Sequence, residues 1–144
     1  MDRALLRLLR TRGHNPSLDD TARLLARLGE NGAVWFALSV AARNRRAFKV
    51  VLVALVANTA IKQVVRRHRP DLGPELPPLS PTISSLSYPS AHSATSFAGA
   101  GALGGGPFYA AAAAMAFTRP YLGVHYPSDV IAGAALGWAV EKLA

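Results

Sequence analysis

The chain has 144 residues, enough for one domain, and it carries a formal net charge of +8. Hydrophobic residues make up 51% and charged residues only 17%, a low charge content for a soluble protein of this size. Cysteine is absent, which excludes disulfide bonds and thiolate chemistry. Arginines interrupt the apolar residues at the start of the chain, so we do not expect a secretory signal there.

The basic residues are concentrated in the first half of the chain. Fourteen of the 16 Lys and Arg lie at or before Arg69. This distribution admits a solvated basic surface, a nucleic-acid contact, or a contact with anionic lipid headgroups. The cations flank apolar runs, and the aromatic residues are too few and too scattered to stack against bases. We therefore expect membrane lipids as partners and no nucleic acid, and the sequence leaves the oligomeric state open.

The first thirty residues predict an amphipathic segment of two short helices. Arginines recur at helical spacing opposite the leucines of residues 5–12. The turn-forming residues 13–16 end this helix. Ser17 is expected to cap a second helix, because Ser is a favoured N-cap and acidic residues follow it. This second helix should end near Gly29.

The rest of the domain, residues 31–144, predicts a bundle of short helices that holds the functional residues. The expected helices cover residues 32–42, 47–65, 91–103, 108–117 and 128–143. Ser90 is expected to cap the helix of residues 91–103, and Ser128 is expected to cap the last helix. The predicted fold class is all-α: five to six short helices with an amphipathic N-terminal segment.

The apolar runs are short for the ~20 residues that a perpendicular membrane span requires. Flanking residues could extend each span to the membrane interface, or the bundle could sit partly in one leaflet. A soluble helical bundle is the alternative, since runs of this length are often buried core helices. Gly133 and Gly137, four residues apart, support close packing between membrane helices. We expect a membrane-embedded, multi-pass bundle in the cell membrane.

Three short stretches of the bundle share one chemistry. They are Lys62 with Arg69-Pro70, then Pro89-Ser90-Ala91-His92, then Thr118-Arg119 with His125 and Asp129. The cations suit the oxygens of a phosphoryl group, and a histidine can accept and pass on that group. Because successive helices reverse direction, all three stretches should lie at the same end of the bundle.

These stretches resemble the signature of the type-2 phosphatidic acid phosphatase superfamily, the lipid phosphatases related to vanadium haloperoxidases. That signature is Lys, six residues, Arg-Pro; then Pro-Ser-Gly-His; then Ser-Arg, five residues, His, three residues, Asp. The spacings within this chain match throughout, and three motifs in order are a specific signal. Ala91 replaces the usual Gly, and Thr118 replaces the usual Ser. Ala91 would cost about 1 kcal/mol if its backbone needed a positive φ, and nothing if only its N–H is used.

The resemblance implies roles for the motif residues in metal-free phosphate ester hydrolysis. It assigns His125 as the nucleophile that forms a phosphohistidine, Asp129 as its orienting group, and His92 as the acid for the leaving oxygen. The implied phosphate ligands are Lys62, Arg69, Ser90, Ala91 and Arg119. We expect no cofactor and no metal, since four histidines without a second carboxylate nearby do not make a metal site.

The implied substrate is a lipid phosphate. Candidates are a polyprenyl phosphate or diphosphate, decaprenylphosphoryl-5-phosphoribose, or a phosphatidic acid-like lipid. The alternative is a non-catalytic membrane protein that binds a lipid phosphate; the intact motif set argues against it.

Two expectations concern the remaining cations. Arg66, Arg67 and His68 are expected to contact headgroups or solvent. The cluster of Arg43, Arg45, Arg46 and Lys49, at the other end of the bundle, predicts by the positive-inside rule that the motif end is extracytoplasmic.

Overall fold

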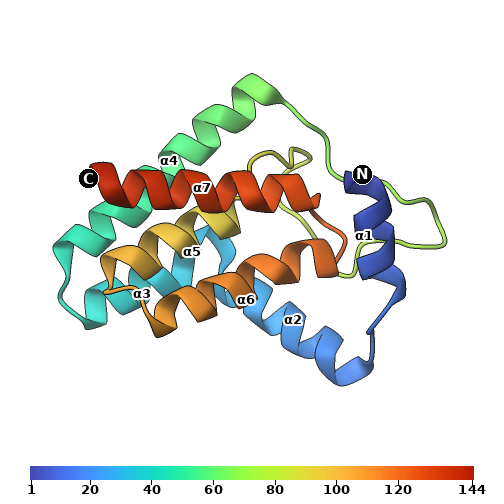
Figure 1. Cartoon of the computed structure of the whole chain (residues 1–144), viewed down its shortest axis with the longest axis horizontal. Coiled ribbons are helices and arrows are strands. Elements are labelled where there is room, and N and C mark those ends of the chain that lie inside the picture. The colour runs from blue at the N-terminus through green and yellow to red at the C-terminus, as the bar shows by residue number, and fades with distance from the viewer.

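The computed structural model describes all 144 residues, and its regular elements are all helices, with a long non-helical link over residues 66–90. In chain order the elements are α1 (Asp2–Thr11), α2 (Pro16–Leu28), the 3₁₀ turn η1 (Glu30–Gly32), α3 (Ala33–Ala41), α4 (Arg45–Val65), α5 (Ala91–Ala102), α6 (Pro107–Tyr121) and α7 (Pro127–Leu143). No β-strand forms, and a single bridge joins His68 to Leu86. The all-α prediction is confirmed, with two helices in the N-terminal segment and five in the bundle (Figure 1).

Helix α5 is the centre of the bundle. Its sequence is made of Ala, Gly, Ser and Thr with one His and one Phe, so neighbouring helices approach it closely. It packs against α4, α6 and α7 (Figure 1). A Cβ at Gly137 of α7 would collide with the carbonyl oxygen of Ala94 and lie 2.9 Å from the amide nitrogen of Ala98. The two helices therefore touch backbone to backbone at this position.

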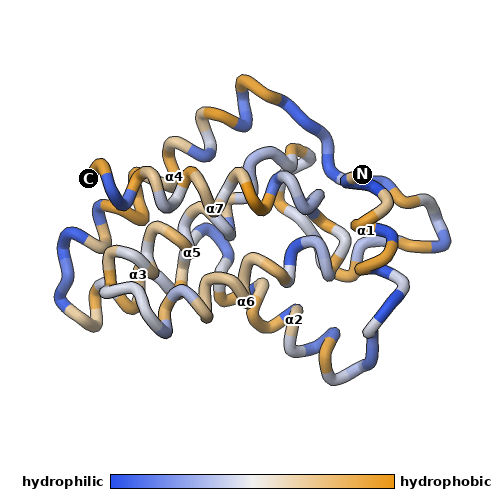
Figure 2. Tube along the Cα trace, in the orientation of Figure 1, coloured by the Kyte–Doolittle hydropathy of each residue, from blue (hydrophilic) through white to orange (hydrophobic).

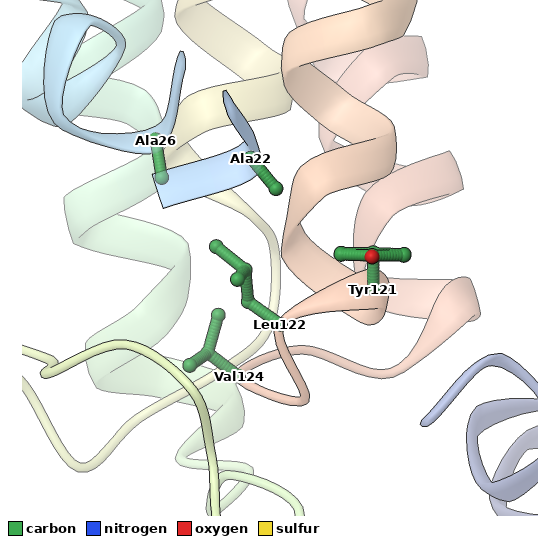
Figure 3. Packing of buried hydrophobic residues seen from close by; sticks show 5 residues of the cluster. All are labelled: Ala22, Ala26, Tyr121, Leu122 and Val124. Carbon is green, nitrogen blue, oxygen red and sulfur yellow. The ribbon is translucent and has the colours of Figure 1, made fainter. Parts of the chain in front are cut away.

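A small apolar cluster fixes α2 against the link between α6 and α7. Ala22 and Ala26 of α2 pack on Tyr121, Leu122 and Val124 (Figure 3). Leu122 and Val124 are fully buried or nearly so. Since Val124 precedes His125, this cluster holds the backbone of the histidine-bearing link and places α2 beside it.

Two of the three predicted N-caps are wrong, and prolines explain both. Ser90 caps α5 as predicted, accepting the N–H of Ser93. Helix α2 is capped by Asn15 rather than Ser17, and α7 by Tyr126 rather than Ser128. Each of these helices has proline as its first residue, where its fixed φ suits the helix, so the cap is the residue before the proline.

Helix α6 is longer than predicted. It continues through Pro120 to Tyr121, so Arg119 lies in its last turn and not in a loop. A proline so close to the C-terminal end removes a single helical hydrogen bond. The final carbonyls, of Thr118, Arg119 and Pro120, accept the backbone N–H groups of residues 122–124. The guanidinium of Arg119 is therefore carried by a hydrogen-bonded helical backbone.

Hydrophobic residues occur along most of the helices (Figure 2), and many of their side chains are exposed. Exposed large side chains include Leu52, Val53 and Val56 of α4, Phe117 of α6, and Ile131 and Trp138 of α7. Helix α4 is the one helix long and apolar enough to cross a membrane, by its length and composition. Only 22% of its most apolar window is buried within the protein, so most of this surface faces outward.

Replacing Gly137 by Ala should destabilise the bundle by about 2 kcal/mol or more, because the added methyl group meets backbone atoms that cannot turn aside. The measurement is thermal unfolding in detergent, compared with Ala135→Ser on the exposed side of α7. Equal unfolding temperatures for the two variants would contradict the close α5–α7 contact.

Candidate active site

The motif residues meet at one end of the bundle, as the reversal of successive helices predicts. A cavity of about 240 Å³ is lined there by Lys62, Arg69, Ala91, His92, Arg119 and His125, together with the loop residues 81–84. These side chains come from α4, α5, α6 and the two long links. In Figure 1 the links gather at the end marked by the N-terminus, and the C-terminus lies at the other end. Six of the eight predicted site residues line one cavity.

Two of the three cations are held by backbone carbonyls. Lys62 Nζ donates to the carbonyls of Leu86, at 3.2 Å, and Ser87, at 3.3 Å. Arg69 Nη1 donates to the carbonyl of Val124 at 2.8 Å. These neutral acceptors orient the charges without cancelling them, so both cations keep their electrostatic attraction for an anion.

Arg119 has no partner within the protein. It is only 4% exposed, it makes no hydrogen bond or ion pair, and its Nε is fully buried. A buried guanidinium without an acceptor is costly, and an anion in the cavity would supply the acceptor. Arg119 is therefore the strongest single indication that this cavity takes an anion.

His125 is held as a neutral imidazole with a defined tautomer. Its Nε2 lies 3.0 Å from Nη1 of Arg69. A guanidinium can only donate, so Nε2 carries the lone pair and Nδ1 the proton. Burial lowers the pKa of His125 well below its ordinary value, and the charges of Arg69 and Arg119 lower it further. The lone pair therefore faces a cationic cavity.

Asp129 lies behind His125, fully buried. Its Oδ2 is 3.5 Å from Nδ1 of His125 and accepts the backbone N–H of Tyr126 at 2.9 Å. Nδ1 of His125 has no hydrogen bond. The structure thus brings His125 and Asp129 close together, and a small movement of either side chain would shorten the 3.5 Å contact to a hydrogen bond. Such contacts are often long before a substrate binds.

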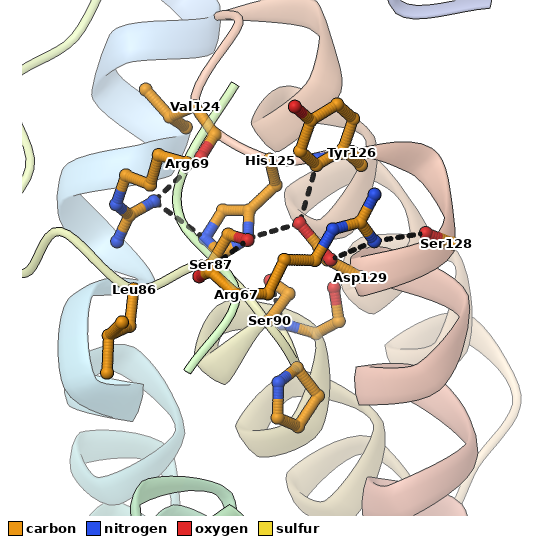
Figure 4. A network of polar contacts seen from close by, with 12 residues as sticks. Arg67, Arg69, Leu86, Ser87, Ser90, Val124, His125, Tyr126, Ser128 and Asp129 are labelled. Atoms are coloured by element: carbon orange, nitrogen blue, oxygen red, sulfur yellow. Dashed lines mark hydrogen bonds and ion pairs between the residues drawn. The ribbon is translucent and has the colours of Figure 1, made fainter. Parts of the chain in front are cut away.

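Arg67 is a site residue that the sequence did not identify. Its Nη1 donates to Oδ1 of Asp129 at 2.9 Å, and its Nη2 to Asp2 of α1 at 2.9 Å. It also lies 4.0 Å over the ring of Tyr126 (Figure 4). The prediction that Arg67 contacts headgroups or solvent holds only in part, because its side chain is 32% exposed but its guanidinium is paired with two carboxylates.

The turn after α4 explains this inward position. Arg66 ends the helix in the left-handed conformation, with φ of 53°, and is itself exposed. The change of direction carries Arg67 inward, which no periodic pattern reveals. The one usable signal was the need of a buried Asp129 for a cation.

His92 lies in the first turn of α5 and is 8% exposed. Its Nε2 is 2.7 Å from the carbonyl oxygen of Ala26. A carbonyl only accepts, so Nε2 carries a proton, and Nδ1 is the nitrogen left to exchange a proton with a ligand. Helix α2 thus orients this imidazole through a single backbone oxygen.

The start of α5 offers backbone donors. Ala91 has ordinary helical φ, so its methyl group carries no backbone strain. The first N–H groups of a helix have no partner within it and attract anions. Ser90 differs from the prediction: it is fully buried, its hydroxyl accepts from Ser93, and it does not line the cavity. Nowhere do three or more His, Cys, Asp or Glu side chains converge as a metal site requires.

Replacing Arg67 by Met should destabilise the protein by about 2 kcal/mol or more, because it leaves a buried carboxylate without its cation. Arg66→Met is the matched control, since the adjacent Arg66 is exposed and makes no side-chain hydrogen bond. Unfolding in detergent measures both variants. Equal losses would show that Asp129 does not depend on Arg67.

Comparison with known proteins agrees with this geometry. The family model "PAP2 superfamily" matches residues 45–144. Decaprenylphosphoryl-5-phosphoribose phosphatase of Mycobacterium tuberculosis is 39% identical over 141 residues, covering 89% of this chain and 79% of that protein. The same-named protein of Mycolicibacterium smegmatis is 39% identical over 131 residues, covering 82% and 72%.

Two solved structures share the fold. The crystal structure of Aquifex aeolicus LpxE superposes with a TM-score of 0.79 at 25% identity, covering 99% of this chain and 93% of that chain. A transmembrane PAP2-type phosphatidylglycerolphosphate phosphatase from Bacillus subtilis superposes with a TM-score of 0.74 at 24% identity, covering 99% and 81%. With its motifs, its fold and its sequence relatives in agreement, the chain belongs to the PAP2 superfamily.

Proposed function

We propose that this protein is an integral membrane phosphatase that hydrolyses a lipid phosphate through a phosphohistidine on His125. The observation that carries the proposal is the lone pair of Nε2, held beside Arg69 in a cavity also lined by Lys62 and the unpartnered Arg119. Three cations can neutralise the three equatorial oxygens of a phosphoryl group, and a neutral imidazole can attack its phosphorus.

The first chemical step forms a phosphorus–nitrogen bond. Nε2 of His125 attacks the phosphorus, and the bond to the leaving oxygen breaks. For this step His92 must carry a proton on each ring nitrogen: Nε2 keeps its proton toward Ala26, and Nδ1 gives its proton to the leaving oxygen, so the product leaves as an alcohol and His92 becomes neutral. The imidazole ring becomes positively charged as Nε2 is phosphorylated, and Asp129 stabilises it through the Nδ1 proton.

The second step reverses these roles. A water molecule attacks the phosphorus, His92 removes its proton, and the phosphorus–nitrogen bond breaks. Inorganic phosphate leaves, and His125 is neutral again. Lys62, Arg69, Arg119 and the N–H of Ala91 hold the phosphoryl oxygens through both steps; each such donor is typically worth about 3 kcal/mol of barrier.

The proposed chemistry uses no metal ion. A divalent cation would be repelled by the charges of Lys62, Arg69 and Arg119. The cavity also offers two histidines and Glu30 as its only ligating side chains, and these do not converge. The cations themselves supply the charge stabilisation that a metal gives in other phosphatases.

The substrate class follows from the relatives and from the surface. The mycobacterial relatives carry the name of a phosphatase for decaprenylphosphoryl-5-phosphoribose. The apolar outer faces of α4 and α7 suit a lipid environment, in which the tail of such a substrate also resides (Figure 2). We therefore propose a polyprenyl-linked or similar lipid phosphate as the substrate.

Replacing His125 by Ala should lower the turnover number by at least about a thousandfold, because the proposed nucleophile is lost and His92 is assigned to proton transfer on the leaving oxygen. The check is labelling with a lipid phosphate that carries ³²P in the transferred group, quenched in alkali because the phosphorus–nitrogen bond is labile in acid, followed by identification of the labelled residue. His68→Ala is the control, since His68 is exposed and makes no side-chain hydrogen bond. Label on the His125→Ala protein would overturn the assignment.

The orientation in the membrane is a further part of the proposal. Residues 1–30 form an amphipathic segment and residues 31–144 the bundle. Arg43, Arg45 and Lys49 lie at the end opposite the cavity, near the start of α4. By the positive-inside rule that end is cytoplasmic and the cavity is extracytoplasmic.

Single cysteines test this orientation cleanly, because the chain has none of its own. Glu75→Cys, in the exposed loop at the cavity end, should react with an impermeant maleimide in spheroplasts. Ala42→Cys, at the opposite end, should react only after lysis. The reverse pattern would place the active site in the cytoplasm.

A further inference from the structure

A second, smaller cavity adjoins the candidate active site. It has a volume of about 70 Å³ and is lined by Arg23, Arg27, Glu30, Ser80, His92 and Arg119, among others. Glu30, His92 and Arg119 also line the larger cavity. The two cavities are therefore neighbours that share one wall. The shared wall includes the guanidinium of Arg119, which has no partner within the protein.

The proposed phosphoryl transfer leaves two cations of this second cavity unused. Arg23 and Arg27 lie one turn apart on α2, so they present to the same side of the helix. Arg23 is held in place, with Nε donating to the carbonyl of Leu79 at 3.0 Å and Nη1 to Asp20 at 2.8 Å. Arg27 makes no hydrogen bond or ion pair and is exposed.

The helix that carries these cations is fixed relative to His125. Ala22 and Ala26, on the same helix, pack against Leu122 and Val124 of the link that carries the histidine (Figure 3). Ala26 also accepts the hydrogen bond of His92. The backbone that carries Arg27 is thus held in place beside the larger cavity.

We propose that the smaller cavity is a subsite for a second anionic group on the polar head of the substrate, a phosphate or phosphodiester. Arg23 and Arg27 bind this group, while Lys62, Arg69 and His125 take the phosphoryl group to be removed. The carboxylate of Glu30 lies between the two sites and suits hydroxyl groups, which can donate to it; a short sugar spacer carries such hydroxyls. This inference rests on the proposed function and narrows its substrate class.

The subsite would let the enzyme discriminate between lipids with one phosphate and lipids with two. Lipids with one phosphate fill the larger cavity alone, whereas a lipid with two separated phosphates fills both. The name of the mycobacterial relatives describes a substrate of this second kind, with a phosphoryl link on one side of a ribose and a 5-phosphate on the other. Charge-assisted hydrogen bonds from arginine to phosphate are roughly twice as strong as hydrogen bonds between neutral groups.

Two matched substrates test the proposal with the full-length protein in detergent. One is a prenylphosphoryl-ribose 5-phosphate, and the other is an alkyl ether of ribose 5-phosphate that lacks the phosphodiester. Arg27→Gln should raise KM for the first by about tenfold or more, since one charge-assisted contact is lost, and leave kcat within about twofold. KM for the ether substrate should not change.

Two further variants complete the kinetic test. Arg27→Lys should recover part of the loss, and Arg7→Gln, which removes an exposed and unpartnered charge from α1, should have no effect. An equal rise in KM for both substrates would show general attraction of anions. No rise for either would show that Arg27 contacts neither ligand. Either result overturns the subsite.

Binding separates a failure of the subsite from a failure of the proposed function. Equilibrium binding of both lipids to the His125→Ala protein requires no turnover. The lipid with two phosphates should bind about tenfold more tightly than the ether, and adding Arg27→Gln should remove that advantage. If the wild-type protein hydrolyses neither lipid yet this difference in binding is present, the phosphatase proposal fails and the subsite stands. If the two lipids bind equally, the subsite is wrong.

Discussion

The rest of the site depends on one constraint: several cations must stay without carboxylate partners at the end of an apolar helical bundle. Lys62, Arg69 and Arg119 surround a neutral His125, and only Asp129 is buried close behind it. Arg67 takes one oxygen of that carboxylate, and the amide of Tyr126 takes the other. The negative charge of Asp129 is thus kept out of the cavity, and the one carboxylate in the cavity lining, Glu30, forms no ion pair with the three cations, so the cavity keeps its affinity for an anion.

The fold maintains this excess of positive charge at the cavity by holding the side chains with backbone hydrogen-bond acceptors. Carbonyl groups orient Lys62, Arg69 and His92, and each carbonyl belongs to a different loop or helix. The small residues of α5 allow α7 to approach to backbone contact, which brings Asp129 against the start of α5; the N–H of Ser90 donates to the carbonyl of Asp129 at 2.9 Å. Helix α2 lies on the other side of the site, where Ala26 accepts the hydrogen bond of His92. A site of this kind costs stability locally, and the surrounding packing offsets that cost.

Sequence patterns predicted the elements and much of the site, because both follow from local chemistry. Helix periodicity, the long Pro- and Ser-rich loop and the motif spacings were sufficient to place the cavity residues at one end. The patterns failed where geometry is not periodic. The left-handed turn at Arg66 brings Arg67 inward, proline moves two helix caps by two residues, and Ser90 is used by its own helix. The contribution of α2 to the site, through Ala26, Arg23 and Arg27, has no sequence signal, because it arises from the packing of segments far apart in the chain.

The central claim is that cations of the protein, and no metal ion, stabilise phosphoryl transfer to a histidine. Its most direct test is inorganic phosphate release by the purified protein from a panel of lipid phosphates, with and without EDTA. The account predicts the same turnover number in both conditions. Activity that disappears in EDTA and returns with magnesium would contradict it.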